Sequence, residues 1–277
     1  MNHRKRQKFI KKIQHWHSVN KPDLPWRKTK NPYHVLVSEV MLQKTQISRV
    51  LIKYPRFLKA FPTIQSLANA PLRRVLSVWQ GMGYNRRGLY LQKAAKEIMQ
   101  KHGGNVPKDV SLLDMLPGIG PYSARAIACF AYGACEPFIE TNIRRVIIYE
   151  FFPRKKKVPD TEILQVLRQI QPPCFQREWY WALMDYGREG LKHIPNANRN
   201  SRHYVKQSKF EGSPRYIRAK IISYLLENKK ATMEEIHASL EKDKYLTWLK
   251  NTDMHRMLVR LQNEHLIAGS KGIFRIV

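Results

Sequence analysis

The chain has 277 residues, of which 43% are hydrophobic and 10% aromatic, so it can build a core and is not globally disordered. Fifty Lys and Arg residues face 21 Asp and Glu residues, which gives a formal net charge of +29 and a pI near 10.2. This charge destabilises a compact state unless an anionic polymer neutralises it, so we expect a nucleic-acid partner. Apolar runs stay shorter than the ~18 residues that cross a bilayer, so we expect a cytoplasmic protein, in the nucleoid if bacterial, without a membrane partner.

Helical periodicity dominates the chain up to about residue 210. Apolar residues recur three and four positions apart, whereas the alternation of a strand is nearly absent. The predicted helical segments are residues 4–18, 35–58, 68–80, 86–104, 108–115, 122–133, 141–151, 160–170 and 175–190. The sequence therefore predicts an all-α domain in this part of the chain.

The composition changes after the last of these segments. KHIPNANRNSRHYVKQSKFEGSP (192–214) is polar, rich in Asn and Lys, and bounded by prolines, as is typical of a linker. Three helical runs follow, PRYIRAKIISYLLEN, TMEEIHASLEK and DMHRMLVRLQNEH. The chain ends in LIAGSKGIFRIV, where two short apolar runs flank a hairpin signal. We expect a domain boundary at residues 207 and 208, followed by a small winged-helix-like (α+β) module.

Three cysteines, Cys129, Cys135 and Cys174, occur in the whole chain. Their spacing does not match a metal site, and an odd number argues against a disulfide framework. We therefore expect free or buried thiols and no metal ion.

A glycine hairpin, LPGIG (116–120), lies between two helical runs. Gly118 and Gly120 permit backbone conformations closed to other residues. They can turn the N–H groups of the loop and of the next helix toward one point, which makes a site for a phosphate. Two helices joined in this way grip the DNA backbone independently of sequence. An ordinary tight turn between helices is the alternative.

Two carboxylates stand out in this basic chain. Glu39 lies between Val37 and Val40 on an otherwise apolar helix, where burial should raise its pKa. Glu140 follows the second hairpin helix after one loop. Two acids in unlike environments can divide the work of acid catalysis. The alternative for Glu39 is a structural ion pair.

Six stretches carry a family resemblance in the correct order. They are LPWR (24–27), PYHVLVSEVMLQKTQISRV (32–50), FPTIQSLANAP (61–71), WQGMGYNRRGLYLQKAA (79–95), LPGIGPYSARAIACFAYG (116–133) and IETNIRRV (139–146). Together they resemble the helix–hairpin–helix DNA glycosylases in which a Gly/Pro-rich loop precedes an acid, and most of all the MutY-type adenine glycosylases. The resemblance covers roughly residues 20 to 190. It implies a two-lobed glycosylase domain at residues 1–207 that acts in base excision repair.

The resemblance also implies catalytic roles. Glu39 matches the acid that protonates the leaving base, and Glu140 falls where the family has an aspartate that stabilises the oxocarbenium-like sugar. Asn142 matches an asparagine beside that aspartate. Tyr122 occupies the position at which relatives such as endonuclease III carry a Schiff-base lysine. Without that lysine an amine-driven lyase step lacks its nucleophile, so we expect a monofunctional hydrolase.

Further positions match residues that contact DNA in the family. A base must leave the stack before its glycosidic bond can be reached, and side chains then fill the gap. The resemblance assigns Gln43, Lys44 and Thr45 to this wedge and Tyr84 to a probe of the opposite strand. The other expected DNA contacts are Arg27, Gly118, Gly120, Ser123, Lys192, Arg199 and Arg202.

The chain departs from the family at Glu140, which replaces an aspartate. One extra methylene adds about 1.5 Å of reach. A misplacement of order 1 Å can cost ~10²-fold in rate. We therefore expect either an adjusted loop, since Thr141 replaces a usual glycine, or low activity.

Two more departures concern the end of the domain. DYGREGLKHIPNANRNSRHYVKQ (185–207) contains no cysteine, so its residues cannot hold the family's iron–sulfur cluster through thiolates. We expect Lys192, Arg199, Arg202 and Lys206 to contact phosphates in its place. We expect no cofactor, with at most a monovalent cation at the hairpin. The winged-helix-like tail stands where the MutY-type proteins have the domain that reads 8-oxoguanine.

The sequence leaves three functions open. The first is a DNA glycosylase that acts as a monomer on double-stranded DNA and excises adenine opposite guanine or 8-oxoguanine. The second excises thymine, uracil or an oxidised uracil opposite guanine, since relatives with that activity also have a tyrosine at the position of Tyr122. The third is a non-catalytic DNA-binding protein, although such a protein gains little from Glu39.

Overall fold

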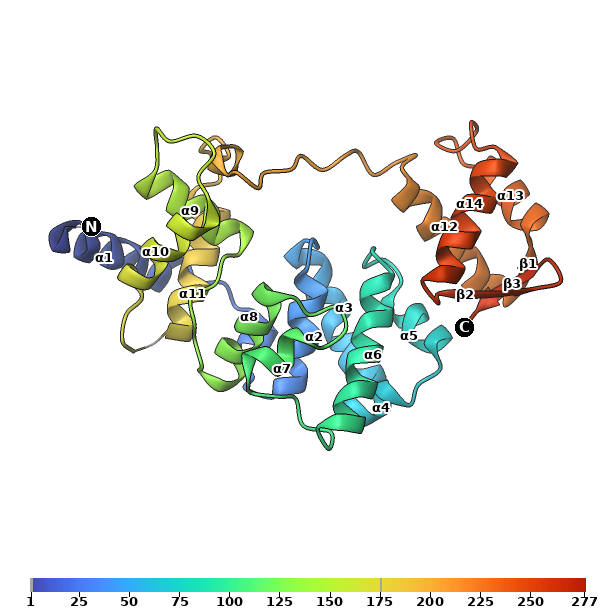
Figure 1. The fold of residues 1–277 in the computed structure, drawn as a ribbon, viewed down its shortest axis with the longest axis horizontal. Coiled ribbons are helices and arrows are strands. Elements are labelled where there is room, and N and C mark those ends of the chain that lie inside the picture. The colour runs from blue at the N-terminus through green and yellow to red at the C-terminus, as the bar shows by residue number, and fades with distance from the viewer. Residues whose placement is uncertain (1, 175) are drawn as a thin grey trace. The chain divides into compact units, whose positions relative to one another are not determined.

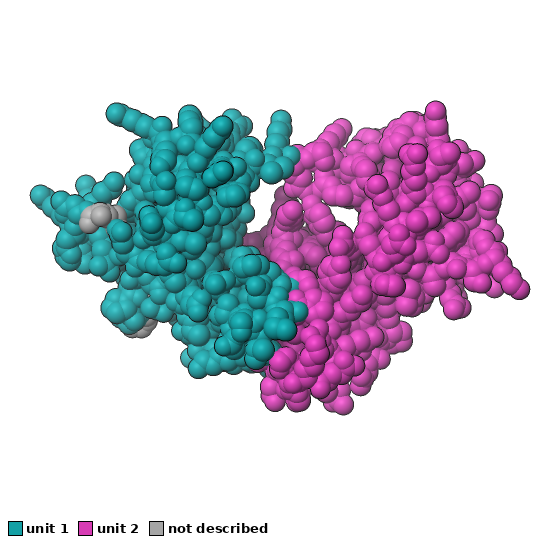
Figure 2. Space-filling model, viewed as in Figure 1, with its two compact units in different colours: residues 1–39, 107–115, 119–206 teal, residues 40–106, 116–118, 207–277 magenta. Residues whose placement is uncertain are grey.

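The computed structural model describes residues 2–174 and 176–277 and shows a mainly helical chain (Figure 1). It forms two compact units that interleave along the sequence (Figure 2). Unit 1 contains residues 1–39, 107–115 and 119–206, and unit 2 contains residues 40–106, 116–118 and 207–277. One change between the units falls next to the boundary expected at residue 207. That residues 208–277 form a separate domain stays a prediction.

Unit 1 is helical throughout. Its elements are α1 (His3–Asn20), η1 (Pro25–Arg27), the first part of α2 (Pro32–Leu42), α7 (Val110–Asp114), α8 (Pro121–Tyr132), α9 (Thr141–Phe151), α10 (Asp160–Ile170), α11 (Gln176–Asp185), η2 (Tyr186–Gly190) and η3 (Ala197–Asn200). The side chains of Ile13, Ile147 and Tyr180 are fully buried in its core. The Tyr180 ring stacks on Phe138 at 4.2 Å between centroids. Phe175, expected to begin the last long helix, lies outside the described residues.

The cysteine prediction is wrong for two of the three thiols, because Cys129 and Cys135 form a disulfide. Helix α8 ends at Gly133, whose φ of 74° is the left-handed conformation that glycine adopts readily at a helix C-terminus. The chain reverses there, so the Cα atoms of the two cysteines lie 4.2 Å apart. Cys174 is free and exposed, as expected.

Unit 2 contains a helical part and a C-terminal module. The helical part has the end of α2, α3 (Ile47–Ala60), α4 (Ile64–Ala68), α5 (Leu72–Trp79) and α6 (Arg86–Lys101). One helix was expected over residues 35–58, but the structure has two, α2 and α3, separated by a turn at Lys44 with φ 53°. Residues 43–46 are polar, but Ile47 and Val50 resume the helical spacing of Val40, so the sequence pattern did not reveal the break.

The C-terminal module has the element order of a winged helix. It consists of α12 (Pro214–Asn228), β1 (Lys230–Thr232), α13 (Met233–Glu241), α14 (Asn251–Asn263), β2 (Ile267–Ser270) and β3 (Ile273–Ile276). The strands form an antiparallel sheet in the order β1-β3-β2. The three helices and the hairpin confirm the predicted fold class, whereas the three-residue strand β1 was not predicted. In the described part of the chain, no helix is both long and apolar enough to cross a membrane.

Candidate active site

Glu39 is a buried acid in unit 1, with 5% of its surface exposed near the C-terminal end of α2. The hydroxyl of Tyr122, on the first turn of α8, donates to Glu39 Oε2 at 3.2 Å. Burial raises the pKa of Glu39 to about 7, while the hydrogen bond from Tyr122 acts in the opposite direction. A carboxyl group with this pKa carries a proton in about half of the molecules at neutral pH, as a general acid requires.

Glu140 is held quite differently, because it caps the N-terminus of α9. Its Oε2 accepts the backbone N–H of Asn142 at 2.6 Å, and its Oε1 accepts from Asn142 Nδ2 at 3.2 Å. Burial raises the pKa of Glu140, and the N–H groups of Asn142 and Ile143 oppose that rise. A carboxylate at a helix N-terminus is stabilised as an anion.

Tyr122 brings the two acids into one site. Burial raises the pKa of its hydroxyl well above the ordinary value, and the charges of Glu39 and Glu140 raise it further. The charge of Glu140 also raises the pKa of Glu39. The structure thus brings together Glu39, Tyr122, Glu140 and Asn142, which the sequence had placed in three separate segments.

Arg27 lies next to this site in an ion pair. Its guanidinium donates to both carboxylate oxygens of Asp185, at 2.6 and 2.9 Å. Burial alone would raise the pKa of Asp185, but hydrogen bonds from His17 and Arg27 hold it below its ordinary value. The charge of Arg27 also lowers the pKa of Glu39. A DNA contact by Arg27 stays a prediction.

Gly187 fixes the backbone next to Glu140, and no sequence pattern indicated this role. Gly187 belongs to η2, a π-helical turn. A Cβ atom at this position would lie 2.3 Å from the backbone oxygen of Asn142. Only glycine therefore allows this turn to lie against the N-terminus of α9, where Glu140 is held.

Arg145 and Asn198 organise the segment in which relatives hold an iron–sulfur cluster. Arg145 donates to the backbone oxygens of Gly187, Leu191 and Ile194, at 3.1, 2.6 and 2.8 Å. Asn198 Nδ2 donates to the backbone oxygen of Thr141 at 3.1 Å. This segment offers carbonyl groups to a guanidinium and has no cysteine, so its residues do not fit a cluster.

The same segment carries exposed basic residues. The structure places Lys192, Arg199 and Arg202 on the surface of unit 1. Their contacts with phosphate stay predictions. Within residues 2–174 and 176–277, no group of three or more His, Cys, Asp or Glu side chains is arranged to hold a metal ion.

The residues assigned to the wedge and the probe lie in unit 2, around one buried arginine. Arg87, on α6, is 9% exposed, and burial lowers its pKa to about 10, so it stays charged at neutral pH. Its guanidinium donates, at 2.6 to 3.1 Å, to the backbone oxygens of Val40, Met41, Gln43, Met82 and Gly83 and to Thr45 Oγ1. One side chain therefore closes the C-terminus of α2 and joins the wedge segment to the turn that carries Tyr84.

Tyr84 is 36% exposed on a tightly bent turn. Its φ is 49°, which is unusual for a residue other than glycine and occurs where the surroundings hold the backbone in place. Gly81 and Gly83 before it also have positive φ values, 83° and 71°. The ring of Tyr84 lies 5.5 Å from the guanidinium of Arg87.

Of the two hairpin glycines, Gly118 must be glycine, whereas the backbone at Gly120 would accept other residues. Gly118 has φ 78°, and a Cβ atom there would lie 2.7 Å from Tyr90 Cβ, so both its conformation and its packing require glycine. Gly118 also accepts a hydrogen bond at its backbone oxygen from Gln43 Nε2 at 3.3 Å. Gly120 caps α8 with φ −111°, which any residue adopts, and no described atom lies within 4 Å of a Cβ added there. The prediction of a special backbone conformation at Gly120 is wrong. The open space at the N-terminus of α8 still agrees with the predicted phosphate site.

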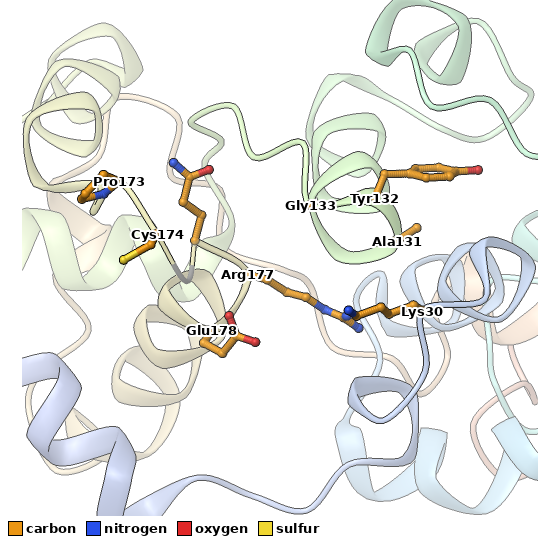
Figure 3. Close-up of a pocket in the computed structure, with 9 residues that line it drawn as sticks. Lys30, Ala131, Tyr132, Gly133, Pro173, Cys174, Arg177 and Glu178 are labelled. Atoms are coloured by element: carbon orange, nitrogen blue, oxygen red, sulfur yellow. The ribbon is translucent and has the colours of Figure 1, made fainter.

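The last predicted contact, Ser123, is 3% exposed on α8. Its side chain lies inside the protein, and its role in DNA binding stays a prediction. A cavity of about 410 Å³ elsewhere in unit 1 is lined by residues of the loop before α2, the end of α8 and the start of α11 (Figure 3). Its described lining includes none of the predicted site residues, so the cavity is not the candidate active site.

Sequence reasoning missed Arg87, Gly187 and Arg145. Arg87 did leave a signal, because it falls on the apolar face of its helix, in register with Leu91, Ala94 and Ile98. A charged residue on such a face needs partners and is a candidate for a structural role.

Comparison with known proteins agrees with this site. A sequence model of the family described as "HhH-GPD superfamily base excision DNA repair protein" matches residues 37–173. The adenine DNA glycosylase of Buchnera aphidicola is 35% identical over 181 residues, which are 65% of this chain and 52% of that protein. That of Mycobacterium tuberculosis is 43% identical over 133 residues, 48% of this chain and 44% of that protein. This chain thus spans about half the length of these relatives.

A shorter relative matches over most of its length. The thymine/uracil-DNA glycosylase of Pyrobaculum aerophilum is 32% identical over 189 residues, 66% of this chain and 82% of that protein. Among solved structures, a thermostable thymine-DNA glycosylase aligns with a TM-score of 0.59 and 25% identity, over 66% of this chain and 86% of that one. A non-covalent endonuclease III–DNA complex aligns with a TM-score of 0.58 and 19% identity, over 69% and 89%. The last similarity concerns the fold alone.

Proposed function

This chain belongs to the HhH-GPD superfamily of base excision DNA repair proteins, and we propose that it is a DNA glycosylase that hydrolyses the bond between one base and its deoxyribose in duplex DNA. The pairing of Glu39 with Tyr122 carries this proposal. A structural acid gains stability from ionic partners, whereas Glu39 is buried with a pKa near neutrality. The relatives named adenine and thymine/uracil DNA glycosylase support the same reaction class.

The two acids divide the reaction between them. The protonated carboxyl of Glu39 donates its proton to the departing base, and the bond from C1′ to the base nitrogen breaks with its electron pair on the base. The carboxylate of Glu140 stabilises the positive charge that develops on the sugar. Water then adds to C1′, and the proton that it loses returns to Glu39. We propose that the carboxylate of Glu140 folds back onto Asn142 and so takes up the extra methylene, and the two hydrogen bonds between these residues support this.

The test is base release from a panel of mismatched and damaged duplexes by the full chain and by Glu39→Gln and Glu140→Gln. Loss of general acid catalysis should lower the single-turnover rate by about 10²–10⁴-fold in Glu39→Gln, with duplex binding unchanged. Glu136→Gln is the matched control, because Glu136 is an exposed acid paired with Arg125 at 3.2 Å. If the unmodified chain binds the duplexes but releases no base from any of them, the protein is a non-catalytic DNA-binding protein, and the proposal fails.

We propose that the enzyme is monofunctional. The Tyr122 hydroxyl keeps its proton, since its pKa lies well above 10, and it donates that proton toward Glu39. A protonated phenol is not the amine nucleophile of a lyase. The product strand should therefore stay intact until alkali is added, and borohydride should trap no covalent protein–DNA complex. Trapping at the level of a lyase run in parallel would contradict this part of the proposal.

We propose adenine opposite guanine or 8-oxoguanine as the target. The relatives named adenine DNA glycosylase, at 35% and 43% identity, support this choice. Thymine or uracil opposite guanine is the second candidate, because the Pyrobaculum relative matches over 82% of its length. Release of thymine or uracil with adenine untouched would decide for the second.

We propose that the enzyme acts as a monomer on double-stranded DNA in the cytoplasm, in the nucleoid if the source is bacterial. The reaction needs only water and the two carboxyl groups, so we propose that it uses no cofactor. A monovalent cation at the hairpin would serve phosphate binding alone.

A further inference from the structure

The side chain of Tyr84 is held by the C-terminal module and its linker. Its hydroxyl accepts hydrogen bonds from Arg215 Nη1 at 2.8 Å and from Gln207 Nε2. The guanidinium of Arg215 also lies 5.7 Å from the centre of the ring. With Arg87 contributing from α6, two cations contact one exposed aromatic ring.

Arg215 binds the linker at the same time. Its Nη2 donates to the backbone oxygen of Ser208 at 2.8 Å and lies 3.4 Å from that of Lys209. Arg215 itself lies in the first turn of α12, which begins at Pro214 after the N-cap Ser213. One guanidinium therefore joins the linker, the module and Tyr84.

Polar side chains hold the module on the helical part of unit 2. Arg73 Nη1 donates to the backbone oxygen of Leu225 at 2.9 Å, near the end of α12. Arg86, two residues after Tyr84, lies 3.6 Å from Glu264, which also pairs with Arg218. These contacts place α12 and the end of α14 next to the turn that carries Tyr84.

We propose that the C-terminal module positions Tyr84 through Arg215 and Gln207 and thereby sets the preference for the base opposite the excised one. The inference rests on the proposed function and on the role that the family resemblance assigns to Tyr84, a probe of the opposite strand. A ring with a fixed hydroxyl loses less conformational freedom when DNA binds, and it accepts only those base steps whose geometry matches it. A loosely held ring adapts to each base and discriminates less. Arg215 and Gln207 act as positioning residues in this proposal.

The test measures binding, so it does not depend on catalysis. Four duplexes carry the uncleavable tetrahydrofuran analogue of an abasic site opposite guanine, 8-oxoguanine, cytosine or thymine, and anisotropy gives Kd for each with the full chain. We call the ratio of the weakest to the tightest Kd among the four duplexes the spread. Arg215→Met loses a charged hydrogen bond, so its spread should be about tenfold smaller than that of the unmodified chain. Gln207→Leu should narrow it by less. Lys242→Met, which removes one exposed charge from the same module, should leave the spread unchanged.

Tyr84→Phe separates positioning from mere folding. It keeps the ring and removes the acceptor, so it should narrow the spread as Arg215→Met does. The two substitutions together should add little to either alone, because they break one interaction. Circular dichroism at the assay temperature shows whether each variant is folded, and Arg215→Lys should restore part of the spread in a folded protein.

Three results would overturn the proposal. In the first, Arg215→Met has the same spread of Kd as the unmodified chain. In the second, the unmodified chain binds all four duplexes equally. In the third, Arg215→Met binds all four more tightly, which would mean that the contacts withhold Tyr84 from DNA. Failure of the proposed function is a separate result, namely that no mismatch or lesion is excised while the four Kd values still differ.

Discussion

The acid pair of unit 1 (Glu39 and Glu140) and the arginine cluster of unit 2 (Arg87 and its six hydrogen-bond acceptors) are built in opposite ways. Glu39 and Arg87 are both buried and ionisable. Glu39 accepts a hydrogen bond from Tyr122 and has a pKa near neutrality. Arg87 donates to six acceptors and stays charged. A group that must gain and lose a proton needs few partners, since each partner favours one protonation state. A group that only holds segments together gains from many partners, because each buried acceptor that it pairs would otherwise be left without a donor.

From this comparison we expect the largest loss of stability when Arg87 is replaced. Arg87→Met leaves several buried carbonyl groups without a donor and should lower the free energy of unfolding by at least about 3 kcal/mol. Arg87→Lys should recover only part of this, because an ammonium has three donors. Chemical denaturation measures both variants. Lys96→Met, at an exposed position on the same helix, is the control and should cost no more than about 1 kcal/mol. A loss below about 1 kcal/mol in Arg87→Met would break the comparison, because the cluster would then not be a structural support.

Replacing Gly187 tests whether catalysis depends on the position of Glu140 that the contact between Gly187 and Asn142 sets. In Gly187→Ala the new Cβ meets the backbone oxygen of Asn142 at 2.3 Å, so the N-terminus of α9 must move. A shift of order 1 Å at Glu140 should lower the rate of base release by ~10²-fold. The overpacking should also cost about 1–3 kcal/mol of stability. Glu189→Ala, an exposed position in the same turn, is the control. Full activity in Gly187→Ala would mean that Glu140 needs no such support.

The sequence predicted the helices well and the contacts between them poorly. Periodicity located the helical segments, and the apolar neighbours Val37 and Val40 were enough to predict that Glu39 is buried. The hydrogen bond from Tyr122 to Glu39 joins residues 83 positions apart, and only the family resemblance had suggested that they meet. Local patterns carry no information on such pairs.

The features that were missed have the same origin. Gly187 must be glycine because of the carbonyl of Asn142, 45 positions earlier in the chain. The disulfide between Cys129 and Cys135 depends on the reversal of the chain at Gly133. The odd number of cysteines in the sequence had argued against any disulfide. The break between α2 and α3 is held by Arg87 from another helix. In each case a tertiary contact decided the local structure, which propensity and periodicity do not encode.

The pH dependence of the reaction sharpens the account of Glu39. Its acid form is the reactive one, and burial raises its pKa to about 7. The single-turnover rate should therefore fall by about tenfold per pH unit above pH 7. It should also fall at low pH, where Glu140, whose pKa burial raises, takes up a proton and loses the charge that stabilises the sugar. Duplex binding measured over the same range provides the control, since a loss of binding would mimic the decline. A rate that is constant from pH 6 to pH 9 would show that Glu39 does not supply the proton.

The most direct contrast with Arg87 concerns the sign of the effect, because removing the charge of Glu39 should stabilise the protein. The folded chain keeps the Glu39 proton up to a pKa of about 7, whereas the ordinary value is 4.5. Between these values the folded state binds more protons than the unfolded state, so this group lowers stability as the pH rises from 4.5 to 7, and the loss is complete above 7. Glu39→Gln cannot ionise, and it should be more stable than the unmodified chain by up to about 3 kcal/mol at pH 8 and equal to it at pH 4. Urea denaturation at the two pH values measures the difference. A variant that is less stable at pH 8 would mean that the ionised carboxylate is well stabilised in the folded chain, and Glu39 would then be a structural acid like Asp185, whose paired carboxylate has a lowered pKa.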